Sequence, residues 1–325
     1  MMQPFFNRRV MLRLAAVALT LGPATVSAET YPEKPITIVV GWGAGGGMDT
    51  FARIVAQHLP QYVGVDVGVE NIKGGGGKVA HERLINEFAA DGYTISASSI
   101  PHQTIPTQIS EGGYRLDDLA WVANMASIPS TIIVRSSSPE QSFSDLVETA
   151  QANPGALTAG SPGATSGAAA FHHAWVDASD VDVTLIPYRG GSAMYKGLAG
   201  EEIYAMSTNA NWALRYPDET RALAVAGEER YPLLPDVPTL KELGIDIVDY
   251  TTRTFTVAAA TPQDRIDTLS TALGELAKDP EFIEAMKTAG LVVDFRDNAG
   301  AEAMVADYVA GNSEIFEMMS KLQGN

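Results

Sequence analysis

Hydrophobic positions in the chain form short β-branched runs that alternate with longer segments of helical spacing. The run at 36–40 breaks into a glycine-rich stretch at 41–47 and continues as a helical pattern from Thr50. Such a run, followed by glycine and then by apolar residues at helical spacing, predicts a strand, a turn and a helix. Further strands are predicted at 65–70, 93–97, 131–134, 157–159, 183–187, 203–206, 222–225 and 254–258, and further helices at 80–88, 144–152, 168–175, 262–277, 281–289 and 300–322. Strands that alternate with helices in this way predict an α/β fold with parallel strands.

The turn after the first strand is the first candidate binding site. Ligands of parallel sheets lie outside the carboxyl ends of the strands, where helix N-termini present unpaired N–H groups and the positive end of a dipole. The third strand ends on hydroxyl residues at the same edge of the sheet. An anion cradle is therefore predicted at Trp42, Gly43, Ala44, Gly45, Gly46 and Gly47, with Ser98 and Ser99 beside it.

A second cluster of hydrogen-bond donors follows the strand at 157–159, where small and hydroxyl-bearing residues precede a helix. Ser161, Thr165 and Ser166 are the predicted ligand-binding residues of this turn. Asn209 is assigned to the same ligand site. The two turns together predict one set of donors from each half of the chain.

Two arginines are candidates for contact with an anionic ligand. Arg189 and Arg253 each stand at an end of a predicted strand, where a guanidinium group can bind a carboxylate through two hydrogen bonds. The alternative for both is a surface ion pair worth under about 1 kcal/mol. Trp42 can either form a wall of the ligand site or pack between lobes.

Two enzymatic alternatives remain open from the residues alone. The segment 41–46 satisfies the G-x-G-x-x-G pattern of dinucleotide sites, but Trp42 and Met48 are bulky where a pyrophosphate would approach. Ser161 or Ser166 could instead be the nucleophile of an exported serine hydrolase, although the neighbouring glycines miss the G-x-S-x-G pattern by one position. The five histidines show neither metal-ligand nor triad spacing, so no metal, cofactor or catalytic residue is predicted.

Residues 1–28 have the pattern of a cleavable secretory signal. An arginine-bearing start precedes an apolar core at 14–21, and Val26-Ser27-Ala28 is typical of a cleavage site. The apolar core is too short to span a membrane. Arg8-Arg9 leaves the export route, Sec or twin-arginine, undecided. The mature chain is therefore expected outside the cytoplasm.

The charge balance narrows the possible partners. The 325-residue chain has 22 Lys and Arg against 39 Asp and Glu, a formal net charge of −17. Such a surface repels nucleic acid and anionic lipid, so neither is expected as a partner. A small anion is not excluded, because exposed charges beyond roughly 8 Å are largely screened. The chain has no cysteine, and its length suits two α/β lobes.

Several short motifs occur in an order that is typical of one family. They are Tyr31-Pro32-x-Lys34-Pro35-Ile36, Ala44-Gly45-Gly46-x-x-Asp49, Val69-Glu70-Asn71, Asp91-Gly92-Tyr93-Thr94, Gly160-Ser161-x-Gly163, Pro187-Tyr188-Arg189-Gly190-Gly191, Arg221-Ala222-Leu223-Ala224-Val225 and Leu234-Pro235-Asp236-Val237-Pro238-Thr239. Through them the chain resembles the solute-binding receptors of tripartite tricarboxylate transporters, the Bug-type or TctC-like proteins.

The resemblance implies a two-lobed periplasmic binding protein of type II-like architecture. Each lobe would contain a mostly parallel sheet flanked by helices, and two crossover strands would join lobe 1 (29–130 plus 254–325) to lobe 2 (131–253). The implied function is that of a periplasmic, monomeric receptor rather than an enzyme. It would capture a small organic anion, a di- or tricarboxylate or an aromatic acid, for inner-membrane permease subunits.

In this family, a ligand carboxylate is held by backbone N–H groups and hydroxyls of one loop per lobe. The corresponding loops here are 42–47 and 161–166. The chain departs from the family pattern at Trp42-Gly43, Lys73 and Thr165. The carboxylate cradle is expected to be intact, and Arg253 is expected to contact the far end of the ligand.

Overall fold

The computed structural model describes Met1 and residues 31–74, 77–109, 113–164 and 166–323. The predicted signal segment 1–28 therefore lies, apart from its first residue, outside the described residues. The strands are β1 (Ile36–Val40), β2 (Val67–Asn71), β3 (Thr94–Ser98), β4 (Leu119–Arg135), β5 (Leu157–Ser161), β6 (Val183–Pro187), β7 (Ala205–Asn209), β8 (Thr220–Val225), β9 (Tyr250–Ala258) and β10 (Val293–Arg296).

The helices lie between these strands and after them. They are α1 (Gly47–His58), α2 (Pro60–Val63), α3 (Lys78–Asn86), α4 (Ile105–Ile109), the 3₁₀ helix η2 (Leu116–Asp118), α5 (Phe143–Ala152), α6 (Gly167–Ala178), α7 (Gly191–Ala199), α8 (Asn211–Arg215), α9 (Gln263–Leu276), α10 (Pro280–Thr288), α11 (Asn298–Gly311) and α12 (Ser313–Gln323). None of the helices in this described part of the chain is long and apolar enough to cross a bilayer.

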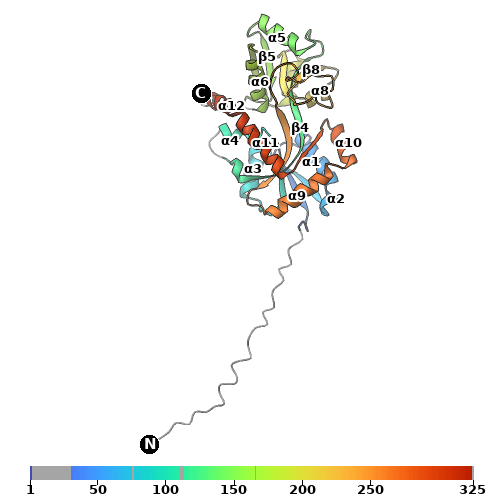
Figure 1. The fold of residues 1–325 in the computed structure, drawn as a ribbon, viewed down its shortest axis with the longest axis vertical. Helices are drawn as coiled ribbons and strands as arrows, with labels where there is room; N and C mark the ends of the chain where they lie inside the picture. Colours follow the sequence, from blue (N-terminus) through green and yellow to red (C-terminus); the bar gives the residue numbers. More distant parts are fainter. Residues whose placement is uncertain (2–30, 75–76, 110–112, 165, 324–325) are drawn as a thin grey trace. The chain divides into compact units, whose positions relative to one another are not determined.

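Two groups of parallel strands are joined by antiparallel strands. β1 pairs in parallel with β2 and β3, and β5 pairs in parallel with β6 and β7. The long strand β4 pairs antiparallel with β9 along its first part and with β7 and β8 along its second part. In Figure 1, β4 runs from the region of α1 and α9 to the region of α5 and α6. One strand therefore belongs to both groups.

Side-chain caps define the starts of several helices. The Ser142 hydroxyl accepts a hydrogen bond from the Asp145 N–H in a capping box at α5, and Ser166 caps α6 by accepting from the Ala169 N–H. Asp279 caps α10, whose first residue is proline. Such caps stabilise a helix by about 1 kcal/mol each, because they satisfy N–H groups that have no partner within the helix.

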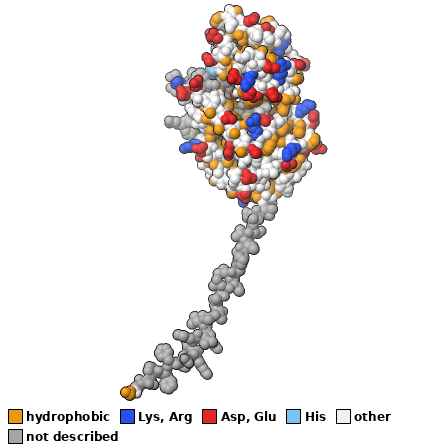
Figure 2. Space-filling model, in the orientation of Figure 1, with side chains coloured by type: hydrophobic (Ala, Val, Ile, Leu, Met, Phe, Trp, Pro, Cys, Tyr) orange, Lys and Arg blue, Asp and Glu red, His pale blue; other side chains and the backbone are white. Residues whose placement is uncertain are grey.

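Apolar side chains pack between the helices and the sheet. Around β5 to β8, Trp175 of α6 and Phe143 of α5 belong to one buried cluster, whereas Met194 of α7 belongs to another. Phe51 of α1 stacks on Phe255 of β9 with ring centroids 5.3 Å apart. Charged side chains of both signs are interspersed over the face shown in Figure 2.

The structure confirms the predicted α/β class with helices flanking the sheet. The predicted strands that became β1 to β3 and β5 to β7 pair in parallel, as expected. Those predicted at 131–134, 222–225 and 254–258 belong to β4, β8 and β9, which pair antiparallel and, with β10, make the sheet mixed. The lobe boundaries expected from the sequence remain a prediction. The first of them, between residues 130 and 131, falls within the continuous strand β4. At this junction the Ser130 N–H donates to the Asp249 carbonyl, and the Asp249 N–H donates to the Ala226 carbonyl.

Several elements differ in length from the prediction, β4, β9 and the C-terminal helix most of all. β9 begins at Tyr250 rather than at 254, which places Arg253 within the strand instead of at its end. β4 has 17 residues, of which the sequence pattern predicted only 131–134. Its first part contains small and polar residues of low strand propensity, such as Asn124, and is held as a strand by pairing with β9 and β10. The helix predicted at 300–322 is two helices, because α11 ends at Gly311 and Asn312 leaves the helical conformation.

Candidate ligand-binding site

A cavity of about 260 Å³ lies where the carboxyl ends of strands from both groups meet β9. The β1–α1 turn and the segment after β3 form one side of it, and the segment after β7 forms the other. Its lining residues are Trp42, Gly46, Gly47, Met48, Ser99, His102, Asn209, Asn211, Trp212, Arg215, Thr251 and Arg253. Because both groups of strands contribute, a molecule in this cavity would contact the two halves of the fold together.

The β1–α1 turn is fixed by the buried carboxylate of Asp49. The carboxylate accepts hydrogen bonds from the Gly45 N–H (2.8 Å), from Arg53 Nε (2.9 Å) and from Asn71 Nδ2 (2.9 Å). Asn71 Nδ2 also donates to the Trp42 carbonyl (3.0 Å). The hydrogen bond from Arg53 is the main reason why the pKa of Asp49 falls from 3.8 to about 2. The turn is therefore held as one hydrogen-bonded unit.

Part of the predicted anion cradle is already used within this turn. The Gly45 N–H donates to Asp49, and the Gly46 N–H donates to the Gly43 carbonyl at 3.3 Å. At the N-cap, Gly46 contributes no side-chain hydrogen bond to the helix. The first N–H groups of a helix have no intrahelical partner. The donors that remain for a ligand are therefore those at the start of α1, at Gly47 and Met48.

Arg253 lies beside this helix N-terminus. A Cβ atom built on Gly47 would be 3.6 Å from Arg253 Nη2. The arginine is 6% exposed, and it is the sole buried Lys or Arg in the described part of the chain. Its Nη1 donates to the Thr252 carbonyl at 2.9 Å, whereas its buried Nε has no protein partner. No carboxylate among the described residues pairs with it, and burial lowers its pKa from 12.5 to about 10.

The cavity has further polar atoms without protein partners. Asn209 Oδ1, Asn211 Oδ1 and His102 Nδ1 are all buried and unpaired. Burial, assisted by the charge of Arg253, lowers the pKa of His102 from 6.5 to about 4. The imidazole is therefore neutral at pH 7. The site combines two arginines, the buried Arg253 and the exposed Arg215, and the positive end of a helix with neutral hydrogen-bonding groups.

The structure brings together six of the predicted ligand-binding residues: Trp42, Gly46, Gly47, Ser99, Asn209 and Arg253. Gly43, Ala44 and Gly45 belong to the same turn but do not line the cavity. Ser98 points away from it, because its hydroxyl is hydrogen-bonded to His81 and Thr256 in the interior. Arg189 is exposed between β6 and α7 and does not line the cavity. Thr165 lies outside the described residues.

The serine turn before α6 is a neighbour of the cavity rather than part of its lining. The Ser161 hydroxyl donates to the Gly163 carbonyl at 2.8 Å, and the Ser166 hydroxyl donates to the same carbonyl at 2.9 Å. The turn packs closely on the segment that follows β3, since a Cβ atom on Gly167 would be 1.9 Å from Pro101 Cγ.

No described histidine is hydrogen-bonded to either serine of this turn. His172, on the adjoining helix, is instead bonded to Ser207 at 3.1 Å and to the Val183 carbonyl at 3.0 Å. A serine hydrolase needs a base within hydrogen-bond reach of its nucleophile. These contacts therefore give the hydrolase alternative no support.

Sequence reasoning missed half of the lining. The missed residues are Met48, His102, Asn211, Trp212, Arg215 and Thr251. The position of Asn211, Trp212 and Arg215 directly after β7 was a usable signal, because the carboxyl ends of all strands in the parallel groups face the same edge. Met48 directly follows the predicted turn, in the first turn of α1. His102 and Thr251 depend on how the segment after β3 and the strand β9 meet the turn, which short-range patterns do not contain.

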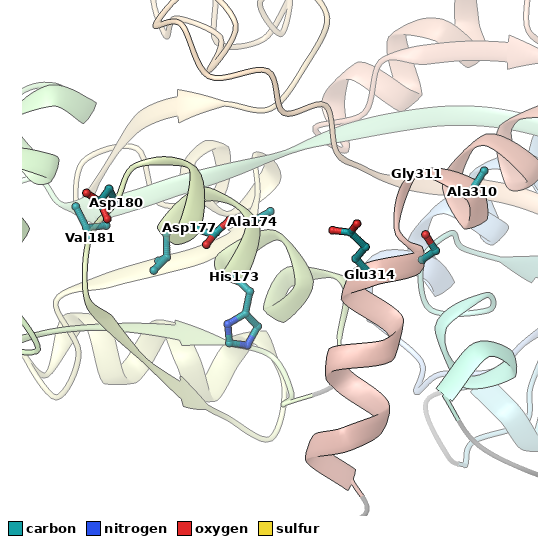
Figure 3. Close-up of a pocket in the computed structure, with 10 residues that line it drawn as sticks. His173, Ala174, Asp177, Asp180, Val181, Ala310, Gly311 and Glu314 are labelled. Atoms are coloured by element: carbon teal, nitrogen blue, oxygen red, sulfur yellow. The ribbon is translucent and has the colours of Figure 1, made fainter.

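A larger cavity, of about 820 Å³, lies elsewhere, between α6 and the start of α12. Figure 3 shows His173 and Asp177 on one side of it and Glu314 on the other. Its charged lining is acidic apart from His173, with Asp177, Asp180 and Glu314. An anion would be repelled there, so the smaller cavity at Arg253 is the better candidate for a carboxylate site.

The fold is that of the bilobed solute-binding proteins. Within this class, the chain belongs to the tripartite tricarboxylate transporter family receptors (TctC), whose match covers residues 51–320. A UPF0065 protein of Agrobacterium vitis is 30% identical over 316 residues, 95% of this chain and 91% of the relative.

Several solved structures have the same fold. The periplasmic binding protein BugD is 27% identical with a TM-score of 0.74, covering 89% of this chain and 98% of BugD. A TctC solute-binding protein from Polaromonas is 25% identical with a TM-score of 0.73, covering 89% and 99%. A protein of R. palustris with adipate (22% identical, TM-score 0.75, covering 90% and 98%) and MatC from Rhodopseudomonas palustris with malate (23%, 0.72, 89% and 100%) share the fold.

Proposed function

We propose that this protein is a periplasmic receptor that captures a small organic acid in the cavity at Arg253. The cavity would close around the acid as the two lobes, 29–130 plus 254–325 and 131–253, come together. The receptor would then deliver the acid, as a monomer, to the inner-membrane permease subunits of a tripartite tricarboxylate-type transporter. The protein would carry out no chemistry on its ligand.

The observation that carries this proposal is the unpaired, buried guanidinium of Arg253 beside the N-terminus of α1. Burying a charge without a partner is costly, and two positive groups side by side increase the cost. A carboxylate in the cavity would reverse both effects. The family's known role and the dicarboxylates named for two fold neighbours are consistent with an acid as the ligand.

The magnitudes suffice for a useful receptor. A micromolar dissociation constant corresponds to about −8 kcal/mol. Hydrogen bonds to charged groups contribute about 1.5–3 kcal/mol each, and two from Arg253 with one or two from α1 supply most of this. Burial of the ligand's apolar part would offset the cost of immobilising it.

The test is a thermal-shift screen of the mature chain with a panel of organic acids, followed by calorimetry. A ligand that binds only the folded state raises the melting temperature in proportion to the logarithm of its concentration. At least one acid is expected to bind, and Arg253→Gln is expected to weaken it by tenfold or more. Arg83→Gln, at a partly exposed arginine of α3 paired with Glu87, is the matched control. Binding that is equal in Arg253→Gln and wild type would refute the proposed site.

Delivery to a permease needs a separate test in cells. Deletion of the gene should abolish uptake of the acid found in the screen, and the wild-type chain should restore it. The Arg253→Gln variant should restore uptake only at raised concentrations of the acid. Uptake that is unaffected by the deletion would refute the role in transport while leaving the binding site intact.

A further inference from the structure

We infer that the acid bound in this cavity is aromatic and carries no ammonium group. This inference rests on the proposed function and narrows its ligand. Two indole rings, of Trp42 from the β1–α1 turn and of Trp212 from α8, line the same cavity as Arg253. They come from opposite sides of the cavity, since Trp42 follows β1 and Trp212 follows β7.

Trp42 is held as a rigid wall. Its outer ring lies on Gly77, where an added Cβ atom would be 3.1 Å from Trp42 Cη2. Gly77 has a φ of +104°, so glycine is favoured there by the backbone as well as by the ring. The ring of His102 meets the indole edge-on, with centroids 6.0 Å apart and an interplanar angle of 88°. Asn71 holds the Trp42 carbonyl through its hydrogen bond.

Trp212 is held in the same manner on the other side. A Cβ atom on Gly191 would be 2.1 Å from Trp212 Cζ2, so the indole needs a glycine beneath it. The ring belongs to a stack with Tyr195 and Tyr216, at centroid distances of 6.3 and 6.1 Å. The Arg215 guanidinium lies 5.7 Å from the indole. Both indoles are thus fixed before any ligand arrives, which lowers the entropic cost of binding a flat ring.

The polar groups of the cavity argue against an amino acid. No Asp or Glu is found among the described residues that line it. An ammonium group would therefore be buried near Arg253 without a carboxylate partner, which is unfavourable for both charges. The free oxygens of Asn209 and Asn211 suit a neutral donor such as a ring hydroxyl. A volume of about 260 Å³ is small for a ligand site and suits a single ring with its substituents.

The test compares matched pairs of acids that differ only in the ring. Benzoate, 4-hydroxybenzoate and benzene-1,3-dicarboxylate are each titrated into the mature wild-type chain against the corresponding cyclohexane acid. Calorimetry gives the affinities, and indole fluorescence reports the contact with tryptophan. We expect the tightest binder to be aromatic and to exceed its saturated partner by about tenfold or more, because ring–ring contacts add to apolar burial. L-Phenylglycine is expected to bind at least tenfold more weakly than phenylacetate.

Variants then assign the preference to the two walls. Trp42→Leu and Trp212→Leu should each lower the ratio between the aromatic and the saturated acid, whereas Trp42→Phe and Trp212→Phe should keep most of it. A ratio below tenfold in the wild type would overturn the inference, whether or not the leucine variants fold. If saturated or aliphatic acids such as succinate and adipate bind as tightly as aromatic ones, the inference fails and the proposed receptor function stands. If no acid of either kind binds, both fail.

Discussion

Replacing Arg253 by glutamine should change stability and affinity in opposite directions. Burial lowers the pKa of this arginine from 12.5 to about 10. At about 1.4 kcal/mol per pKa unit, the buried charge costs the empty protein about 3 kcal/mol. Because pH 7 lies below both pKa values, the arginine is charged in the folded and unfolded states, and the whole cost applies. The cost would diminish only as the pH rises through 10 toward 12.5.

Glutamine removes this charge but also removes the hydrogen bond from Nη1 to the Thr252 carbonyl. That bond is worth about 1 kcal/mol. The empty Arg253→Gln protein should therefore be more stable than wild type by about 2 kcal/mol, which corresponds for a chain of this length to a melting temperature roughly 3 °C higher. The same variant should bind an acid ligand about 10- to 100-fold more weakly, because charge-assisted hydrogen bonds of about 1.5–3 kcal/mol are lost.

Calorimetric melting of the empty proteins and titration with the acid measure the two effects separately. Arg83→Gln should change neither by a comparable amount, since Arg83 is partly exposed and a surface ion pair such as that with Glu87 is weak. Arg253→Lys should retain part of the affinity, because the lysine ammonium keeps the charge but cannot bind a carboxylate through two parallel hydrogen bonds as a guanidinium can. A variant Arg253→Gln that melts lower than wild type and binds the acid equally well would refute the reasoning.

Three further predictions concern the elements around the cavity. Asp49→Asn should lose about 2 kcal/mol of stability above pH 4, because the pKa of Asp49 in the folded protein is about 2. The difference from wild type should vanish as the pH falls from 4 to 2. Urea unfolding at several pH values measures this difference, and a difference that persists at pH 2 would contradict the prediction. Gly77→Ala should cost more stability than Gly64→Ala, since both glycines have positive φ but only the former carries the Trp42 ring; equal losses in thermal unfolding would show that the ring contact is unimportant. Ser166→Ala should lower stability by about 1 kcal/mol through loss of the α6 cap, and the wild-type protein should not react with a serine-directed fluorophosphonate probe; labelling of Ser166 would revive the hydrolase alternative.

The periodic parts of the fold could be predicted because their signal is local. The strand at 36–40 and most of the helix Phe143–Ala152 follow from a β-branched run and from apolar residues at helical spacing. The first half of β4 could not, because residues such as Asn124 favour a strand only when β9 and β10 pair with them. Long-range pairing overrides local propensity there.

The candidate site shows the same division. The position of the β1–α1 turn followed from the rule that ligands lie at the carboxyl ends of strands, and Arg253 was expected at the cavity. Which donors of the turn are free was not predictable, because Asp49 takes up the Gly45 N–H only once α1 has formed. Trp212 was missed because the position of its indole depends on close packing against Gly191, which is distant in sequence. Sequence patterns locate a turn but not the partners that occupy it.

The proposed anion site depends on binding of the ligand carboxylate by the Arg253 guanidinium. It is tested most directly by NMR of protein labelled with ¹⁵N-arginine, in which the Nε–H resonance missing from Arg253→Gln identifies this residue. When an acid that binds by calorimetry is added, that resonance should shift to a new position in parallel with saturation, and the Arg83 resonance should stay in place. If the protein saturates with the acid while the Arg253 resonance does not move, the account of the site is wrong.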